Sequence, residues 1–469
     1  MKKYLKIICV AVIAVSGASC NSWLDVTPED RIVGENLFKD KAGYLKALNG
    51  IYGELNKTNS FNIRTLDYMG QYYNYPVEYR WEQGYGVDYL LETNWANAYS
   101  LIINCNEIIL QCGEAGNPVL AGGYYNLYKG EAIALRAMLH LDLLRYYGPM
   151  WSQKEDLAIP YMTKSDRQSQ PLLPATAVLD SIINDLKIAS ALLETVDPVI
   201  TQGTNNAPNE YGDTEWSYRQ YRLNYYAAQL LLARAYLWGG DTQHAGETAR
   251  KVISEAVRWF PFVTDEYMAA NGEDRIFSPE VLFAFYNTSR TNEIFNTYFN
   301  VATTTGMVAY GSIASGRVSH LYDSHNDVRY KMWLEITENN ITNTRLQKYA
   351  GTSNVKYGYM VPRIRMSEAY LIAAECDPDV QTALTNYLNP VRYVRKCPDA
   401  VCTTSEELNE LIQAEYLREF IGEGQLFFYF KRRELPVIPV GNVANGTQTM
   451  TSAQYVAPLP ESEREIRGM

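Results

Sequence analysis

The sequence has little of what metal, redox or nucleic-acid chemistry requires. It holds 4 histidines and 7 cysteines in 469 residues, and no two histidines stand at the i, i+4 spacing that shares one helix face. Its 42 basic side chains face 53 acidic ones, a net charge of −11, which argues against a surface that follows nucleic-acid phosphates. The G-x-S-x-G, H-E-x-x-H and Walker motifs are also missing. We therefore expect no metal, no cofactor and no nucleic-acid partner.

Long hydrophobic runs are scarce as well, and the main one lies at the start of the chain. Ile7 to Val15 is apolar and follows three lysines. A bilayer core needs about 20 apolar residues, so this shorter run predicts a signal peptide. Small residues and then Cys20 follow, a pattern that resembles the lipobox of bacterial lipoproteins. The resemblance implies cleavage after residue 19 and acylation of Cys20, with groups such as palmitate, as a membrane anchor. An ordinary signal peptide is the alternative.

The cysteines do not form a disulfide framework. Five remain after Cys9 and Cys20 are set aside, without a repeated spacing, and this pattern is typical of neither a disulfide scaffold nor a zinc site. Cys105 and Cys112 stand on one predicted helix, about 10.5 Å apart along its axis and too far for a bridge. Cys397 and Cys402 flank a predicted loop, and pairing between them stays open.

Helical periodicity dominates the rest of the chain. Apolar residues recur at helical spacing, and glycine or proline ends several stretches, as Gly148-Pro149 does. We predict a mainly α fold in which tetratricopeptide-like helix pairs form a scaffold and a few short strands complete it. The expected helices are Asp40 to Leu55, Asn94 to Gln111, Tyr124 to Tyr147, Pro174 to Glu194, Leu223 to Trp238, Gln243 to Val257, Arg365 to Cys376, Val380 to Arg395 and, from a capping box at Ser405, on to Phe420.

Two loop-rich regions interrupt this scaffold. We divide the chain into the signal peptide, residues 1–19, and one domain, residues 20–469. Within the domain the helical scaffold covers about 40–55, 94–147, 174–257 and 363–422, and the loop-rich regions cover about 60–93 and 260–355. Irregular segments of this length are usually functional. We therefore predict that they carry the binding surface.

Six segments, in order along the chain, stand out as sequence motifs and together extend from Cys20 almost to the end of the chain. The segments are Trp23-Leu24-Asp25-Val26, Glu131 to Ala137 with Asp142 to Gly148, Ala233 to Leu237, Arg363 to Glu375, Glu415 to Arg432 around Gly422-Glu423-Gly424, and Leu459-Pro460 with Glu463 to Ile466. They are similar to landmarks of the SusD/RagB family of surface nutrient-binding lipoproteins. Gln425 and Phe428 depart from the family pattern, so no role is transferred to residues 425–430.

The resemblance implies a lipid-anchored protein on the outer face of the outer membrane, beside a SusC-like TonB-dependent transporter. Such a protein captures oligosaccharides without a covalent step and delivers them to the transporter, so we expect no enzyme activity. Two alternatives stay open. The same lid mechanism would serve peptides or other nutrients, and the many acidic residues would allow a glycoside hydrolase pair.

The charged residues of these motifs are predicted to be structural. A buried charge without a partner costs several kcal/mol, so we expect inter-helix ion pairs from Arg136, Arg234, Arg365, Glu368, Glu375 and Glu419. Gly422 and Gly424 predict a tight turn. Asp327 and Arg329 are expected in a structural turn instead of a calcium site, and His320 and His325 at the surface.

Aromatic side chains gather in both loop-rich regions. The chain has 38 tyrosines, and an aromatic ring can take the apolar face of a sugar while polar neighbours bind its hydroxyls. Phe283 and Phe285, in the β-like run Val281 to Tyr286, are predicted to be core. The ligand-binding candidates are Tyr72, Asn74, Tyr75, Trp81, Tyr85, Asp88 and Asn94 in the first region and Tyr286, Arg290 and Tyr298 in the second.

Overall fold

The computed structural model describes residues 36–57, 66–67, 69–70, 87–166, 168–204, 215–300 and 307–469. The predicted signal peptide, the acylation site Cys20 and most of the first loop-rich region lie outside these residues. Five ligand-binding candidates lie outside them too, and for Asp88 the backbone is described but not the side chain. These five candidates are Tyr72, Asn74, Tyr75, Trp81 and Tyr85.

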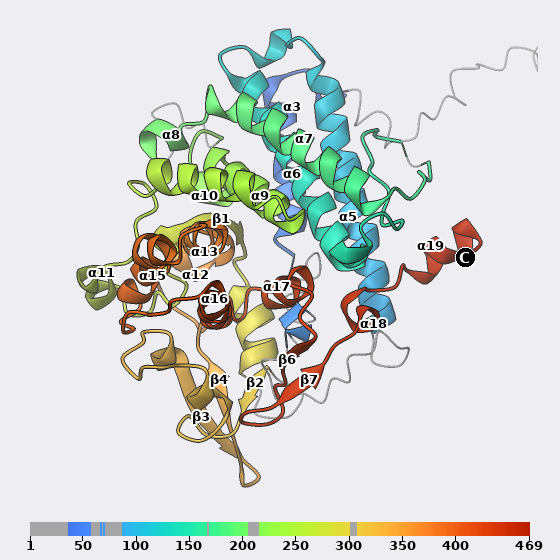
Figure 1. Cartoon of the computed structure of the whole chain (residues 1–469). Helices are drawn as coiled ribbons and strands as arrows, with labels where there is room; N and C mark the ends of the chain where they lie inside the picture. Colours follow the sequence, from blue (N-terminus) through green and yellow to red (C-terminus); the bar gives the residue numbers. More distant parts are fainter. Residues whose placement is uncertain are drawn as a thin grey trace, which may run out of the picture.

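Helices that pack on their neighbours in chain order form the upper part of the molecule (Figure 1). Successive helices of this series contact each other, from α3 on α5 to α9 on α10. The predicted helices of this part are confirmed, although α5 begins before the expected residue 94. The bounds are α3 (Lys41–Leu55), α5 (Val87–Cys112), α6 (Tyr124–Tyr147), α7 (Ala175–Glu194), α9 (Tyr225–Trp238) and α10 (Thr242–Ala256).

Helix α6 runs through the centre of this layer and is buried on all sides from Leu127 to Tyr147, apart from a more open Lys129. It ends at Gly148, as the sequence predicted, where the glycine N–H donates to the Leu144 carbonyl. Because no face of α6 meets solvent, its charged side chains must find partners inside the protein. This position explains why acidic and basic residues stand inside an otherwise apolar helix.

A second group of helices follows near the C-terminus and packs under the first through α13, which contacts both α9 and α10. The predicted helix over Val380 to Arg395 is helical from Val380 to Val394, but its middle turn, just before Pro390, is π-helical, and Pro390 has no N–H to donate. The bounds are α13 (Met366–Cys376), α14 (Val380–Ala383), the π-helix η9 (Leu384–Leu388), α15 (Asn389–Val394), α16 (Ser405–Glu419) and α17 (Leu426–Arg432).

The capping box of α16 is one residue earlier than predicted. The Thr404 hydroxyl accepts from the Glu407 N–H at 3.2 Å, and the Glu407 carboxylate accepts from the Thr404 N–H at 3.1 Å. Thr404 is therefore the N-cap, and Ser405 is the first helical residue. Both threonine and serine can cap a helix through their hydroxyls, so the adjacent pair left the sequence ambiguous by one position.

A two-stranded antiparallel sheet crosses the middle of the molecule. It pairs β1 (Val281–Tyr286) with β5 (Met360–Arg365). The bounds of β1 are as predicted, and Phe283 and Phe285 are buried as predicted. The sequence missed β5, which continues into α13 and brings residues 363–365 into the sheet instead of the helical scaffold.

A three-stranded sheet, in the order β2-β4-β3, extends the lower end of the molecule (Figure 1). Its strands are β2 (Val308–Tyr310), β3 (Trp333–Glu338) and β4 (Ile341–Leu346). Asn339 and Asn340 connect β3 to β4 with φ of 50° and 64°, a backbone region that asparagine tolerates better than most residues. The prediction of an irregular block at 260–355 missed this hairpin.

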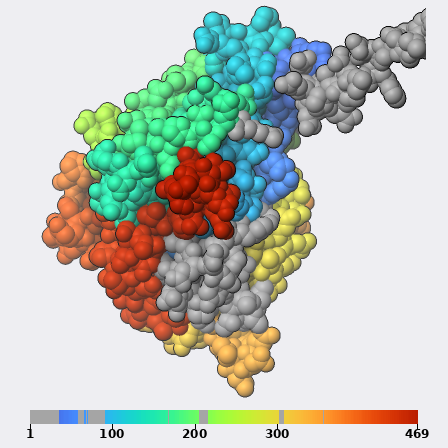
Figure 2. Space-filling view, turned by 90° about the vertical axis from the view of Figure 1, so that its right-hand side faces the viewer, coloured from blue at the N-terminus to red at the C-terminus, as the bar shows by residue number. Residues whose placement is uncertain are grey.

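Shorter elements connect these parts. Figure 2 shows the C-terminal helix at the surface, over the earlier helices, and the β3–β4 hairpin projecting below. The remaining bounds are α8 (Val199–Gln202), α11 (Asp265–Ala270), the π-helix η6 (Thr291–Phe299), α12 (Val355–Gly358), β6 (Val437–Pro439), β7 (Thr447–Thr449), α18 (Ser452–Tyr455), α19 (Glu461–Arg467) and short 3₁₀ turns at Pro118–Leu120, Trp151–Gln153, Arg219–Tyr221, Ser278–Glu280, Arg317–His320 and Tyr330–Met332. The mainly α fold is confirmed, and the tetratricopeptide-like character of the helix pairs stays a prediction.

The predicted structural ion pairs are confirmed. Arg136 holds Asp185 with two hydrogen bonds of 2.7 and 2.8 Å, and Arg234 holds Glu368 at 2.7 and 2.6 Å. Such paired donors fix the register of the helices as well as their charge. In the same way Arg365 contacts Glu419, Arg432 contacts Glu375, and Arg329 contacts Asp327.

The remaining structural predictions concern cysteines, turns and metals. Cys105, Cys112, Cys376, Cys397 and Cys402 are all free, and the Cys397 thiol donates to Asp327 at 3.0 Å. Gly422 and Gly424 adopt positive φ in the predicted turn, and His320 and His325 are exposed. Across the described ranges, no group of side chains could hold a metal ion, and no helix is long and apolar enough for a membrane span.

Candidate functional site

A hollow of about 780 Å³ opens at the carboxyl end of β1. We call it the β1 hollow. Its size lies within the range of about 300–1,000 Å³ that is usual for ligand pockets. Side chains from α3, from the segment before α9, from the end of β1 and from α12 meet here. The described lining residues are Asn49, Tyr52, Gly53, Asn56, Tyr218, Gln220, Tyr221, Arg222, Tyr286 and Lys356.

Tyr286 stands on the rim because β1 ends with it. The strand is buried from Val281 to Phe285, and Tyr286 emerges with 42% of its surface exposed. The rings of Tyr221 and Tyr359 contact it edge-to-face, with centroids 5.0 and 5.5 Å away. Its N–H donates to the Asn56 side chain at 2.6 Å. Two rings and one backbone bond thus hold Tyr286 while part of its surface stays open.

Tyr218 lies in the left-handed region, with φ of 52°, and is 37% exposed. A non-glycine residue reaches this region only when its surroundings impose it. The next residue supplies the constraint. Arg219 is fully buried, and its guanidinium donates twice to Asp197, at 2.9 and 2.8 Å, and once to Glu131, at 2.6 Å. The bonds of Arg219 to the interior hold this segment of backbone in place, and Tyr218 beside it stays at the surface.

The floor of the hollow is a hydrogen-bonded network under Tyr52. The Tyr52 hydroxyl donates to Glu131 at 2.8 Å and accepts from the Leu223 N–H at 2.9 Å. Burial, and then the negative charge of Glu131, raises the pKa of Tyr52 well above its ordinary value. The Arg222 guanidinium lies over the Tyr52 ring, 5.3 Å from its centroid, and donates to the Asn49 side chain at 2.7 Å. The floor is therefore rigid and prearranged.

The rim on the other side comes from α12. The Lys356 carbonyl accepts from the Tyr221 hydroxyl at 3.2 Å, and the Lys356 N–H donates to the Asn354 side chain at 3.0 Å. These bonds fix the backbone while the Lys356 side chain stays exposed. Aromatic faces, amides and cations thus surround the hollow, a set that suits a ligand with apolar faces and acceptor oxygens.

The predicted candidates that the structure describes do not all meet here. Tyr286 lines the β1 hollow, but Asn94 lies on α5 near Asp142 and Tyr146, beside a different, small cavity. Arg290 is buried, and its guanidinium donates to the carbonyls of Tyr357 and Met360 at 2.8 and 2.9 Å. It therefore holds the backbone next to the hollow, and a role for Arg290 in ligand binding stays a prediction.

Tyr298 sits in the π-helix η6 and is half-buried against the core. Its carbonyl accepts from the Met307 N–H at 2.6 Å, so its backbone is fixed. The structure does not place its ring in the lining of the β1 hollow. A role for Tyr298 in ligand binding stays a prediction.

Several lining residues escaped the sequence analysis. Tyr52 belongs to a predicted scaffold helix, and Tyr218, Tyr221 and Arg222 fall within the range 174–257 that was assigned to the helical scaffold. The sequence Trp216 to Arg222 alternates aromatic, polar and basic residues without helical period. That composition was a signal for a binding surface, but only the fold brings it next to β1 and α12.

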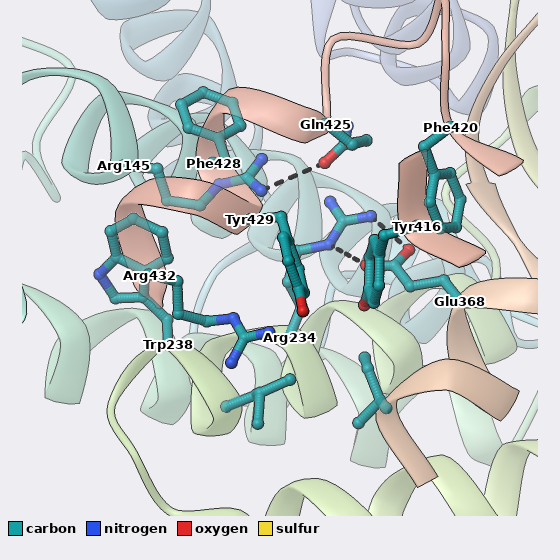
Figure 3. Close-up of a pocket in the computed structure, with 12 residues that line it drawn as sticks. Arg145, Arg234, Trp238, Glu368, Tyr416, Phe420, Gln425, Phe428, Tyr429 and Arg432 are labelled. Atoms are coloured by element: carbon teal, nitrogen blue, oxygen red, sulfur yellow. Dashed lines mark hydrogen bonds and ion pairs between the residues drawn. The ribbon is translucent and has the colours of Figure 1, made fainter. Parts of the chain in front are cut away.

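A second cavity lies inside the helical layers, between α6, α9, α13, α16 and α17 (Figure 3). Its volume of about 30 Å³ suits water and is far too small for a sugar. The rings of Tyr416 and Tyr429 stack beside it with centroids 4.4 Å apart. This cavity belongs to the packed interior.

The two positions that depart from the family pattern meet at this cavity. The Arg145 guanidinium donates to the Gln425 side chain at 3.3 Å and lies 4.1 Å from the centroid of the Phe428 ring. Arg145 also pairs with Asp142 on its own helix. Gln425 and Phe428 therefore complete the surroundings of one buried arginine, which is a structural role.

Comparison with known proteins gives concordant results. Residues 279–458 match the family model described as the SusD family. The SusD-like protein P38 of Formosa agariphila is 29% identical over 213 residues, which are 42% of this chain. The match spans only 39% of the length of that relative.

Solved structures resemble the whole fold. A SusD superfamily protein from Bacteroides thetaiotaomicron has a TM-score of 0.70 at 22% identity, over 91% of this chain and 98% of that one. A SusD-like carbohydrate-binding protein from Bacteroides vulgatus has a TM-score of 0.68 at 18% identity, over 91% and 96%. At such identities the likeness shows the fold.

Proposed function

We propose that the chain, which matches the SusD family model over residues 279–458 and is similar to a SusD-like relative, captures oligosaccharides at the bacterial cell surface and passes them on unchanged. On this proposal the β1 hollow is part of the capture surface. The ligand is held by ring stacking and hydrogen bonds, and no bond of the glycan is broken.

One observation carries this proposal. The hollow combines glycan-sized space with two half-exposed tyrosines on a fixed framework. A sugar presents a flat C–H face to an aromatic ring and hydroxyls to amides and cations, and both are offered here. A prearranged site loses little conformational entropy when the ligand binds. The Bacteroides vulgatus protein of the same fold, which is described as carbohydrate-binding, supports the same ligand class.

The described lining of the hollow supports binding over catalysis. It contains no carboxylate, histidine or cysteine, whereas a glycosidase needs two carboxyl groups about 5–10 Å apart across the scissile bond. We therefore propose a binding protein. Incubation with a bound oligosaccharide should return it at its original length, and a shortened product would contradict this part of the proposal.

The site is tested by titrating the purified chain with a panel of oligosaccharides and a panel of peptides. We expect at least one oligosaccharide to bind and Tyr286→Ala to weaken it at least about tenfold, the loss of one well-packed aromatic contact. Tyr310→Ala is the matched control, because Tyr310 is 41% exposed but lies on β2. Binding of peptides alone would favour the peptide alternative.

Anchoring and delivery complete the proposal. Cys20 would carry the lipid that holds the chain at the outer face of the outer membrane, and a TonB-dependent transporter would receive the glycan. Cys20→Ala should release the chain from the membrane fraction. Cells without the chain should take up the bound oligosaccharide more slowly and recover when the gene is restored. Unchanged uptake would argue against delivery.

A further inference from the structure

We propose that the β1 hollow selects oligosaccharides that carry a negative charge, a uronate carboxylate or an ester sulfate, over neutral oligosaccharides of the same backbone. This inference rests on the proposed function, since it assumes that the hollow holds a glycan. It adds the chemical class of that glycan.

The described lining of the β1 hollow is positively charged. Two cationic side chains, Arg222 and Lys356, belong to it, and its described residues include no carboxylate. The whole chain carries 53 acidic against 42 basic residues, so a described lining with two cations and no carboxylate differs from the average of the chain. Local charge of one sign concentrates ligands of the opposite sign.

The two cations of the lining differ in their exposure: Lys356 is exposed and Arg222 is buried. The Lys356 side chain is exposed, and none of the described carboxylates forms an ion pair with it. Arg222 is 92% buried (8% exposed), and its contact with Glu131 is long, 3.6 Å between Nη1 and Oε2. Lys356 can therefore contact a ligand directly, and the positive charge of the buried Arg222 attracts an anionic ligand from the floor of the hollow.

The charged side chains beneath the hollow and at its rim include more cations than carboxylates. Glu131 forms ion pairs with two arginines. Arg219 donates to one carboxylate oxygen at 2.6 Å, and the Arg222 guanidinium lies 3.6 Å from the other oxygen. Asp197 is committed to Arg219. Glu215, another buried residue in contact with Arg219, pairs with Lys41 at 3.5 Å. With Lys41 and Lys356 included, four cations face three carboxylates at the floor and rim. An anionic group in the hollow would neutralise the remaining positive charge.

The geometry also assigns separate tasks to the two kinds of side chain. Tyr218 and Tyr286 offer exposed ring surface, which recognises the sugar ring irrespective of charge. The cations recognise the substituent. Affinity for the sugar backbone and preference for charge are therefore carried by different residues and can be changed one at a time.

The test uses pairs of probes that differ only in charge. Oligogalacturonates are compared with their methyl esters, sulfated oligosaccharides with their desulfated forms, and sialylated glycans with their asialo forms, all by calorimetric titration of the purified chain. We expect the charged member of at least one pair to bind about tenfold more tightly, as a charge-assisted hydrogen bond permits. The preference should shrink as salt is added. The pair that responds identifies carboxylate or sulfate as the ligand chemistry.

Lys356→Gln is the decisive variant. Because the ammonium is exposed and partly screened, we expect affinity for the charged probe to fall about two- to fivefold while the neutral partner is unaffected. Lys356→Glu should lower it further. Lys331→Gln, which removes an exposed lysine from the turn before β3, is the control and should change neither affinity.

The outcomes separate this inference from the proposed function. If neutral and charged partners bind equally, or if Lys356→Gln weakens both alike, the charge preference is overturned and glycan capture stands. If no glycan of either kind binds, the proposed function fails and this inference fails with it.

Discussion

The helical layers and the β1 hollow use the same residue types in opposite ways. In the layers, arginines close buried ion pairs, as Arg395 does with Glu280 and Glu419, and tyrosines stack out of contact with solvent. At the hollow, Tyr218 and Tyr286 keep more than a third of their surface open and Lys356 has no described carboxylate partner. The buried pairs and rings of the layers stabilise the fold, whereas the exposed rings and the exposed lysine of the hollow remain able to contact a ligand. Stability and binding should therefore respond to different substitutions.

The largest effect on stability is expected from Glu419→Gln. Glu419 is fully buried against Arg329, Arg365 and Arg395. Its substitution removes the one carboxylate that all three arginines share and leaves an excess of buried positive charge beside their other partners, which are Asp327, Glu415, Glu423 and Glu280. We expect the free energy of unfolding in denaturant to fall by about 3–5 kcal/mol. Glu410→Gln, at an exposed position of the same helix, should change it little. A similar loss in both variants would contradict the assignment of stability to the buried network.

The same residue predicts how stability depends on acid. Burial raises the pKa of Glu419, but the charges of Arg395, Arg365 and Arg329 outweigh burial and hold the pKa well below its ordinary value. The stabilisation is therefore complete above pH of about 4.5 and is lost as the pH falls further. The wild-type curve should show this loss in acid, and the Glu419→Gln curve should lack that component.

Lys431 is an exception inside the layers and sharpens the comparison. It is buried, and its described hydrogen bonds go to the carbonyls of Tyr146 and Gly148. Burial lowers its pKa to about 7. The unfolded chain then binds more protons between pH of about 7 and 10.5, so stability should rise with pH across this window, by up to about 1.4 kcal/mol per unit. The rise should disappear in Lys431→Met, measured by denaturant unfolding at several pH values.

Tyr286→Ala tests the other side of the comparison. We expect glycan affinity to fall at least about tenfold, or about 1.4 kcal/mol, while the free energy of unfolding changes by less than about 1 kcal/mol, because the ring is partly exposed. Tyr286→Phe keeps the ring and should retain most of the affinity. A variant that lost stability and kept affinity would reverse the roles assigned to the two regions.

The smallest effect is expected at a helix end. Thr404→Ala removes the hydroxyl that caps α16 and should lower the free energy of unfolding by about 1 kcal/mol. Thr404→Ser retains the cap and should be close to wild type. Glycan affinity should be unchanged in both, since α16 does not contribute to the lining of the hollow.

The sequence predicted the helical layers well because periodic apolar residues and their end signals are local. Tyr124 to Tyr147 with Gly148 gave α6, and Val281 to Tyr286 gave β1. The π-helical segment before Pro390 was missed although proline itself is a local signal, and the β3–β4 hairpin was missed because the exposed β3 has little alternation. The turn pair Asn339-Asn340 was its one clear mark.

Fewer residues of the candidate site could be predicted from local sequence patterns. Tyr286 could be selected because aromatic and polar residues gather in the second loop-rich region, which is a local signal. Tyr52, Tyr218 and Lys356 come from segments that are distant in sequence, and only the packing of α3, β1 and α12 brings them together. Arg290 was selected because it stands beside aromatic residues, and the fold places its guanidinium in a buried position where it donates to backbone carbonyls.

The most direct test of the central claim is a crystal structure of the chain with the tightest-binding oligosaccharide of the panel. The account predicts a sugar ring against Tyr218 or Tyr286 in the β1 hollow, with any charged substituent directed toward Lys356. A glycan bound on another face, with the hollow empty, would contradict it.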